Sequence, residues 1–171
     1  APFMAAVLSA DMDNTDKIVT LIDECRSMRL EVNPPHVNHS SLMFTVTSND
    51  VIVYGLGAIK GIGESAIESI IEARNKAGAY LDLFDFCRRI DLKKANRRVL
   101  EALVRAGALD RLGANRATLM IQLPLALKVA EQHAEMQATG QDDLFGMAAA
   151  EPVAVDDGVV PAAIEEWDDD Q

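Results

Sequence analysis

Apolar residues recur every three or four positions along most of the chain, which is the spacing of an amphipathic helix. One such run covers residues 3–8, and a second begins at the capping residues Asn14 or Thr15 and ends near Met28. Further helices are predicted at residues 64–76, 82–89, 94–106 and 114–138. Pro124 falls inside the last of these, where it predicts a kink or a break.

A different pattern separates the second helix from the third. Asn33-Pro34-Pro35 excludes a helix and predicts an extended segment. Ser41–Thr47 and Val51–Tyr54 are rich in β-branched and aromatic residues and flank a short polar turn, so they predict a small β-hairpin. The expected fold is therefore mainly α with a small β-hairpin.

Charge is strongly segregated along the 171 residues, whose net charge is −11. The net charge is −4 over residues 1–54, +4 over 55–120, −3 over 121–150 and −8 over 151–171. The overall excess of acid argues against a free-standing nucleic-acid-binding protein, but the basic middle is a candidate surface for an anionic partner. From Gly140 onward small apolar residues and acids predominate, which predicts a tail of low intrinsic order.

The remaining sequence features bear on the cellular compartment of the protein and on the extent of the chain. Cys25 and Cys87 have no metal-ligand or redox spacing, so both are expected to be reduced, half-buried helix residues in a cytoplasmic protein. No apolar run reaches the roughly 18–20 residues that span a bilayer, so no membrane partner is expected. The chain starts without Met and inside a helical pattern, which predicts that it is a piece of a longer one.

The clearest motif lies in residues 55–75, where Lys60-Gly61-Ile62-Gly63 precedes an amphipathic helix. It resembles the helix-hairpin-helix motif. Two glycines let the backbone turn tightly and approach a ligand, and their N–H groups lie where the helix begins, which favours an anion. Ile62 is expected to lock the two helices together, and Lys60 to contact a neighbouring phosphate. The alternative is an ordinary glycine turn between core helices.

A degenerate second copy follows the first. Residues 96–104 form a predicted helix, residues 105–108 a hairpin with the single glycine Gly107, and residues 113–116 open another helix. Two hairpins in tandem would hold both strands of duplex DNA across the minor groove by their phosphates, without reading sequence. The candidate DNA-binding residues are Lys60, Gly61, Ile62, Gly63, Lys93, Lys94, Arg97, Arg98, Arg105, Gly107 and Arg116. Arg88 and Arg89 are expected to be solvated surface residues.

A short linear motif follows the last predicted helix. Gln141, Leu144 and Phe145 resemble the Gln-x-x-Leu-Phe peptide by which bacterial replication and repair proteins bind the sliding clamp. An exposed Leu-Phe pair in an acidic stretch favours burial in the pocket of a partner. The alternative is that both side chains fold back onto the helices of this chain.

In combination, these segments resemble the C-family replicative DNA polymerases, the alpha subunits of bacterial DNA polymerase III. The resemblance covers nearly all of residues 1–147 and rests on these ordered stretches: Phe3–Ala6, Ser9–Asn14, Tyr54–Gly61, Asn96–Leu100 and Ala106–Asp110. His36 and Asn33 depart from the usual pattern. The resemblance implies an end of the fingers at residues 1–54, a tandem helix-hairpin-helix region at 55–139, a clamp-binding peptide at 140–147 and an acidic linker at 148–171.

The same resemblance bears on Asp11-Met12-Asp13, a pattern that otherwise suggests a two-metal site. It implies that the catalytic aspartates and their Mg²⁺ lie in a palm domain upstream, so Asp11 and Asp13 are interpreted as helix-end residues. No catalytic residue, metal or cofactor is expected in this fragment.

The sequence therefore predicts a polymerase fragment that binds duplex DNA without sequence preference and tethers the enzyme to its sliding clamp. Other replisome subunits are further candidate partners. Two alternatives stay open: a stand-alone helix-hairpin-helix protein of repair or uptake, and a protein-only replisome scaffold.

Overall fold

The computed structural model describes residues 1–47 and 49–138. Helices predominate there, as the apolar spacing predicted. The elements are α1 (Pro2–Ala10), α2 (Thr15–Ser27), β1 (Val32–Asn33), β2 (Thr45–Val46), β3 (Ile52–Val53), the 3₁₀ turn η1 (Leu56–Ala58), α3 (Glu64–Ala77), α4 (Leu83–Arg89), α5 (Arg97–Arg105), the 3₁₀ turn η2 (Asp110–Leu112) and α6 (Arg116–Ala138). The predicted acidic tail and clamp peptide, residues 140–171, lie outside the described residues.

The predicted β-hairpin is present as β2 and β3, which pair antiparallel with Thr45 opposite Val53. A third strand, β1, pairs parallel to β3, so the strand order is β1-β3-β2. The proline-containing segment was expected to be extended, but its pairing was not predicted. Pairing with a strand some twenty positions away depends on tertiary packing and leaves no periodic pattern within so short a segment.

A small buried cluster joins α1, α2 and the sheet. It contains Met4, Ala5, Leu8, Ile18, Cys25, Phe44, Ile52 and Ala58. Asn14 caps α2 by accepting a hydrogen bond from the backbone N–H of Lys17 at 3.1 Å, in agreement with the predicted cap. The expectation of half-buried cysteines was wrong, because Cys25 and Cys87 are almost completely buried. Cys25 belongs to this cluster, and Cys87 belongs to the larger one described next.

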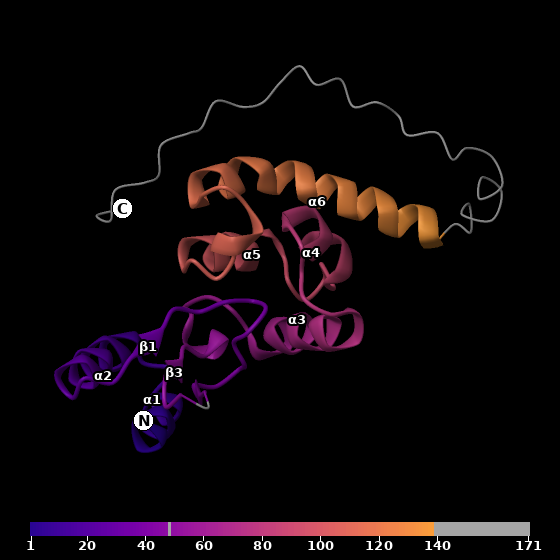
Figure 1. The fold of residues 1–171 in the computed structure, drawn as a ribbon. Coiled ribbons are helices and arrows are strands. Elements are labelled where there is room, and N and C mark those ends of the chain that lie inside the picture. The colour runs from indigo at the N-terminus through magenta and orange to yellow at the C-terminus, as the bar shows by residue number, and fades with distance from the viewer. Residues whose placement is uncertain (48, 139–171) are drawn as a thin grey trace.

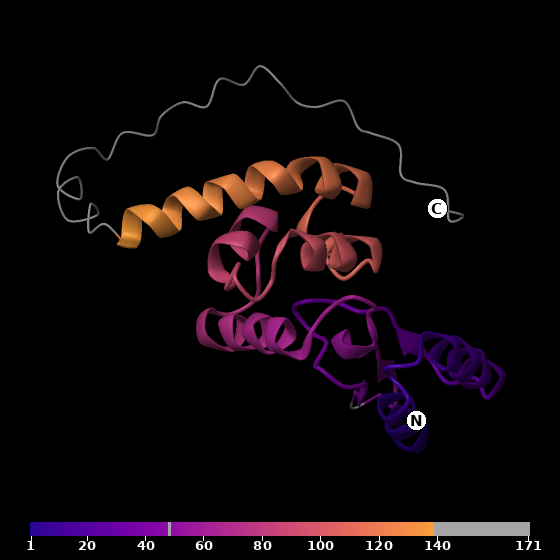
Figure 2. The same ribbon diagram turned by 180° about the vertical axis from the view of Figure 1, so that it is seen from behind.

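A larger cluster lies among α3, α4, α5 and α6. Its fully buried members include Ile67, Ile70, Phe86, Leu100, Leu103 and Leu119. In Figures 1 and 2 the long helix α6 lies across α4 and α5, while α1, α2 and the sheet lie beyond α3. Pro124 is exposed, and α6 continues through it from Arg116 to Ala138, so the proline does not break the helix.

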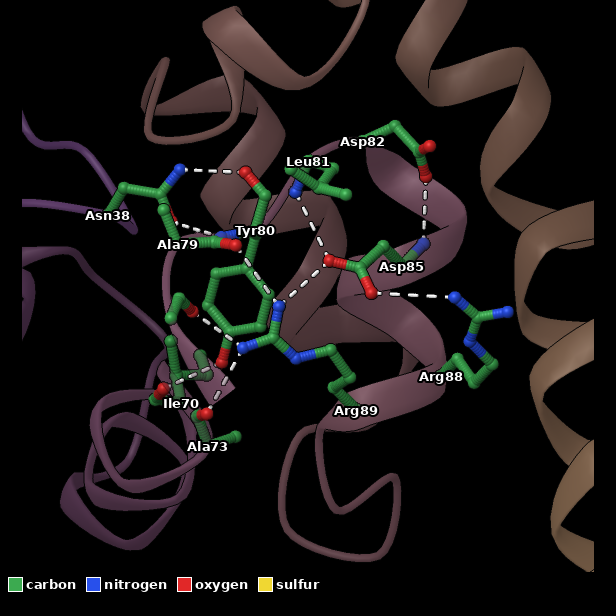
Figure 3. Close-up of polar contacts among 11 residues, drawn as sticks. Asn38, Ile70, Ala73, Ala79, Tyr80, Leu81, Asp82, Asp85, Arg88 and Arg89 are labelled. Carbon is green, nitrogen blue, oxygen red and sulfur yellow. Dashed lines mark hydrogen bonds and ion pairs between the residues drawn. The ribbon is translucent and has the colours of Figure 1, made fainter. Parts of the chain in front are cut away.

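A polar network connects the end of α3 to α4 (Figure 3). The Arg89 guanidinium donates to Asp85 Oδ2 at 2.8 Å and to the carbonyl oxygens of Ala73, Gly78 and Ala79. It also lies over the ring of Tyr80, 4.5 Å from its centroid. The expectation of a solvated Arg89 was therefore wrong, since four polar contacts and a ring hold its side chain at 16% exposure.

The partners of Arg89 are themselves fixed in place. The Tyr80 hydroxyl donates to the carbonyl oxygen of Ile70 at 2.6 Å, and burial raises the pKa of that phenol to about 12. Burial alone would raise the pKa of Asp85, but the Leu81 N–H and the Arg89 guanidinium bind its carboxylate, and the net effect is a lowered pKa. The network thus holds an ionised aspartate and a neutral tyrosine on opposite sides of one arginine.

None of the described helices combines the length and apolar character needed to cross a membrane.

Candidate nucleic-acid interface

The first predicted hairpin lies between η1 and α3. Gly61 has φ +88°, in the left-handed region that favours glycine, and Gly63 is the extended residue before α3. A side chain built at Gly61 or Gly63 would meet nothing within 4 Å, so the backbone here is open to an approaching ligand. Ile62 packs against the larger cluster, as the motif predicted. The element before the hairpin is a single 3₁₀ turn rather than a full helix.

The start of α3 suits an anion. No side chain caps this helix; the Ala66 N–H donates to the Gly63 carbonyl oxygen at 3.1 Å, whereas the N–H groups of Glu64 and Ser65 precede the first bond of the helix. They carry the positive end of the helix dipole, which favours a phosphate oxygen. Glu64 in the same turn opposes this, although its side chain is exposed and can turn away from a ligand.

The second hairpin follows α5. Asn96 caps that helix by accepting from the Val99 N–H at 3.3 Å. Gly107 has φ +76° and is buried beneath an ion pair in which Arg116 donates to both carboxylate oxygens of Asp110, at 2.9 Å each. A β-carbon at Gly107 would lie 2.5 Å from the Arg116 guanidinium. This glycine therefore has a conformational role, and its backbone is not open in the way that Gly61 is.

The two hairpins meet at a hollow of about 410 Å³. Lys60 and Gly61 border it from the first copy, and Asn96, Arg98 and Arg105 border it from the second. No ion pair joins Lys60, Arg98 or Arg105 to another described residue. Among the described residues that line the hollow, Glu101 is the only acid, and Arg97 pairs with it at 2.8 Å. Three cations without an ion-pair partner in the described part of the chain therefore line the same hollow as the open backbone of Gly61.

Comparison with known proteins agrees with this geometry. A family model described as a helix-hairpin-helix motif matches residues 29–119, more than half of the chain. The chain belongs to the helix-hairpin-helix family. The match includes both hairpins and also the sheet, which precedes the first glycine motif.

Individual relatives are longer proteins. The chain is 56% identical over 156 residues to DNA polymerase III subunit alpha of Vibrio cholerae, which covers 91% of this chain and 14% of the relative. It is likewise 56% identical over 156 residues to the subunit of Escherichia coli K12, covering 13% of that relative, and 53% identical over 169 residues to that of Pseudomonas aeruginosa. The chain thus spans about one seventh of the length of these curated relatives. The predicted resemblance to the alpha subunits is confirmed.

The other predicted DNA-binding residues of this helix-hairpin-helix chain lie outside the hollow. Lys93 and Lys94 are exposed in the turn before α5 and do not border it. Arg97 and Arg116 are engaged in the ion pairs described above. Asn96 was not among the candidates. Its only signal in the sequence was its place as the cap of α5, and a cap signal does not reveal that Asn96 borders the hollow beside Lys60 and Gly61.

Asp11, the first of the two aspartates near the N-terminus, has a structural partner. Asp11 is the C-terminal cap of α1 and binds the Lys17 ammonium at 2.8 Å, which agrees with the helix-end interpretation. Within residues 1–47 and 49–138, no group of three or more His, Cys, Asp or Glu side chains is placed to hold a metal ion. The clamp-peptide residues Gln141, Leu144 and Phe145 lie outside the described residues.

Proposed function

We propose that this chain binds duplex DNA without sequence preference, as part of a replicative DNA polymerase alpha subunit, and that the phosphates lie in the hollow between its two hairpins. The observation that carries the proposal is the convergence of Lys60, Arg98 and Arg105 on the open backbone of Gly61. Phosphates are the same at every base pair, so such contacts fix position and carry no sequence information.

The net charge of −11 is compatible with this function because charge acts locally. At physiological salt the screening length is about 8 Å, so acids outside the basic segment weaken the attraction only slightly. We expect a Kd on the order of 10⁻⁴–10⁻⁶ M at physiological salt, as for other non-specific DNA contacts, with a steep salt dependence.

The test replaces Lys60, Arg98 and Arg105 together by Gln and measures duplex binding at several salt concentrations. Each lost phosphate contact lowers the slope of log K against log salt by about 0.9, so the triple variant should lose about 2.7. A control of equal charge replaces Arg26, Arg29 and Lys128, which are exposed and do not border the hollow. If both triple variants show the same slope, the hollow is not the DNA site.

A glycine substitution gives a second, steric test. Gly63→Val adds a branched side chain into open space at a backbone conformation that valine accepts, so it should weaken DNA binding and leave the fold intact. Gly61→Val is less informative, since at φ +88° any side chain strains the backbone. A folded Gly63→Val variant with unchanged DNA affinity would contradict backbone contact with phosphate.

The two alternative functions predict different results. A protein-only replisome scaffold would show no saturable duplex binding even at low salt, and a normal titration would therefore exclude it. A stand-alone repair or uptake protein would also bind DNA, but the identity to alpha subunits over about nine tenths of the chain favours the polymerase.

We also propose that Gln141, Leu144 and Phe145 bind the sliding clamp and so tether the polymerase in the cytoplasm to its replisome. Burial of the two apolar side chains offsets the cost of ordering the peptide, so the affinity should be about micromolar. Leu144→Ala with Phe145→Ala should abolish clamp binding in calorimetry, whereas Met147→Ala, outside the motif, should not. Loss of the thermal transition in the double variant would instead place these residues in the core of this chain.

Nucleotide transfer is proposed for the longer polymerase and not for this chain. The resemblance assigns the Mg²⁺-binding aspartates to a palm domain upstream, and Asp11 is committed to Lys17. The contribution of this chain is to hold the duplex and the clamp.

A further inference from the structure

A second polar cavity lies apart from the hollow between the hairpins. It measures about 460 Å³, opens to solvent and lies between the sheet and η2. Its polar lining comes from Asn33, His36, His39, Thr45, Thr47 and Arg111, none of which borders the proposed DNA site. A cavity of this size accepts a small ligand.

The charge around this cavity is positive. Asp110, the acid next to Arg111, is bound through both carboxylate oxygens by Arg116. No ion pair or hydrogen bond joins Arg111 to any residue within the described part of the chain. Arg74 lies nearby and uses its guanidinium on the carbonyl oxygens of Val37 and Ser40, at 2.9 and 2.8 Å. The guanidinium of Arg111 is therefore free to bind an anion.

His36 reports the same positive charge. Burial lowers the pKa of His36, and the positive charges of His39, Arg111 and Arg74 lower it further, against an opposing effect of Asp110. The neutral ring accepts the Asn38 N–H at Nδ1, at 3.0 Å, so its own proton lies on Nε2. That buried N–H has no acceptor among the described residues. The ring of His39, whose centroid lies 4.7 Å from that of His36, is exposed and can move to admit a hydrogen-bond acceptor.

Hydroxyl groups complete the donor set. Thr47 Oγ1 already accepts the Val51 N–H at 3.3 Å, which leaves its O–H to donate. Thr45, two residues earlier in β2, is exposed and also borders the cavity. A guanidinium, an imidazole N–H and two hydroxyls are all donors, and no described residue of the lining carries a negative charge.

We propose that this cavity binds a phosphate group, held by Arg111 with donors from Thr45, Thr47 and His36. The same chemistry fits two sources, a free phosphate and a phosphate of the DNA backbone that extends past the second hairpin. The backbone N–H of Val37 donates to Ala108 in that hairpin at 3.0 Å, so the two regions are joined. The proposal does not depend on the DNA hollow described above.

The experiment follows the imidazole C–H resonances of the intact chain by NMR. The chain has three histidines, and the third, His133, lies on α6 and serves as an internal control. The probes are inorganic phosphate and a short DNA duplex, each titrated at fixed pH and constant ionic strength. We expect saturable shifts of His36 and His39 with at least one probe, and no shift of His133.

The two probes distinguish a free phosphate from the DNA backbone, and the variants distinguish this cavity from the DNA hollow. Saturation with phosphate supports a free phosphate as ligand, and saturation with duplex alone supports the DNA backbone. Arg111→Gln should weaken binding at least tenfold, Arg111→Lys should restore part of it, and Arg26→Gln, an equal charge change on α2, should have no effect. Duplex-induced shifts that survive the Lys60, Arg98 and Arg105 replacements would separate this cavity from the proposed DNA hollow. No saturable shift with either probe, parallel shifts of all three histidines, or full binding by Arg111→Gln would overturn the proposal.

Discussion

The network around Arg89 gives the sharpest test of what holds the two hairpins in position. Arg89→Ala removes an ion pair between side chains that are only 16% and 12% exposed, and it leaves the Asp85 carboxylate without its main partner. It also removes hydrogen bonds to three carbonyl oxygens and the contact with the Tyr80 ring. Arg88→Ala is the matched control, because the neighbouring arginine is 49% exposed and reaches the same carboxylate at 3.4 Å.

The two substitutions should differ strongly in their effect on the free energy of unfolding. Removing one partner of a buried pair costs about 3–5 kcal/mol, because the remaining charge stays buried without compensation. An exposed pair contributes about 0–1 kcal/mol. Small domains are stable by about 5–15 kcal/mol, so Arg89→Ala should remove a large fraction of the total while Arg88→Ala should remove little.

Urea unfolding followed by circular dichroism measures the difference. With a slope of about 1–3 kcal/mol per molar, a loss of this size lowers the midpoint by roughly 1–5 M. Adding Asp85→Asn to Arg89→Ala should recover part of the loss, since the uncompensated charge is then gone. The interpretation fails if the two arginine variants have midpoints within experimental error of each other, or if the double variant is as unstable as the two single losses added together.

Three further outcomes follow from the structure. The folded-state pKa of Asp85 lies below its ordinary value of 3.8, so the stabilisation that its carboxylate contributes is present above that value and is lost as the pH falls through the folded pKa. Measured between about pH 6 and pH 2, the free energy of unfolding should therefore fall less in Asp85→Asn than in the unchanged chain. Gly107→Ala should cost more unfolding free energy than Gly61→Ala, by up to about 1 kcal/mol, since both have positive φ but only at Gly107 would the new β-carbon displace an ion pair; equal costs would mean that the pair adjusts freely. The chain alone should incorporate no nucleotide on a primed template with Mg²⁺, and incorporation that disappears when Asp11 and Asp13 are replaced by Ala would refute their helix-end role.

Local sequence signals predicted the elements well for identifiable reasons. Gly63 and the apolar residues at helical spacing predict the helix that starts at Glu64, and the Asn14 cap predicts the start of α2. These signals act within one or two turns of chain, so a single sequence contains them. The pairing of β1 with β3 joins residues twenty positions apart, and no local pattern specifies it.

The roles of the individual arginines could not be predicted in the same way. Arg89 and Arg98 both lie in the basic segment and look alike in the sequence, yet one is enclosed by carbonyl oxygens and the other faces an open hollow. The difference arises because α4 turns Arg89 toward the end of α3, where Ala73 and Gly78 have carbonyl oxygens to be satisfied. A guanidinium with five donors is the side chain best suited to several such acceptors at once. Charge counted along the chain therefore locates a basic surface, but tertiary contacts decide which of its cations remain available to a phosphate.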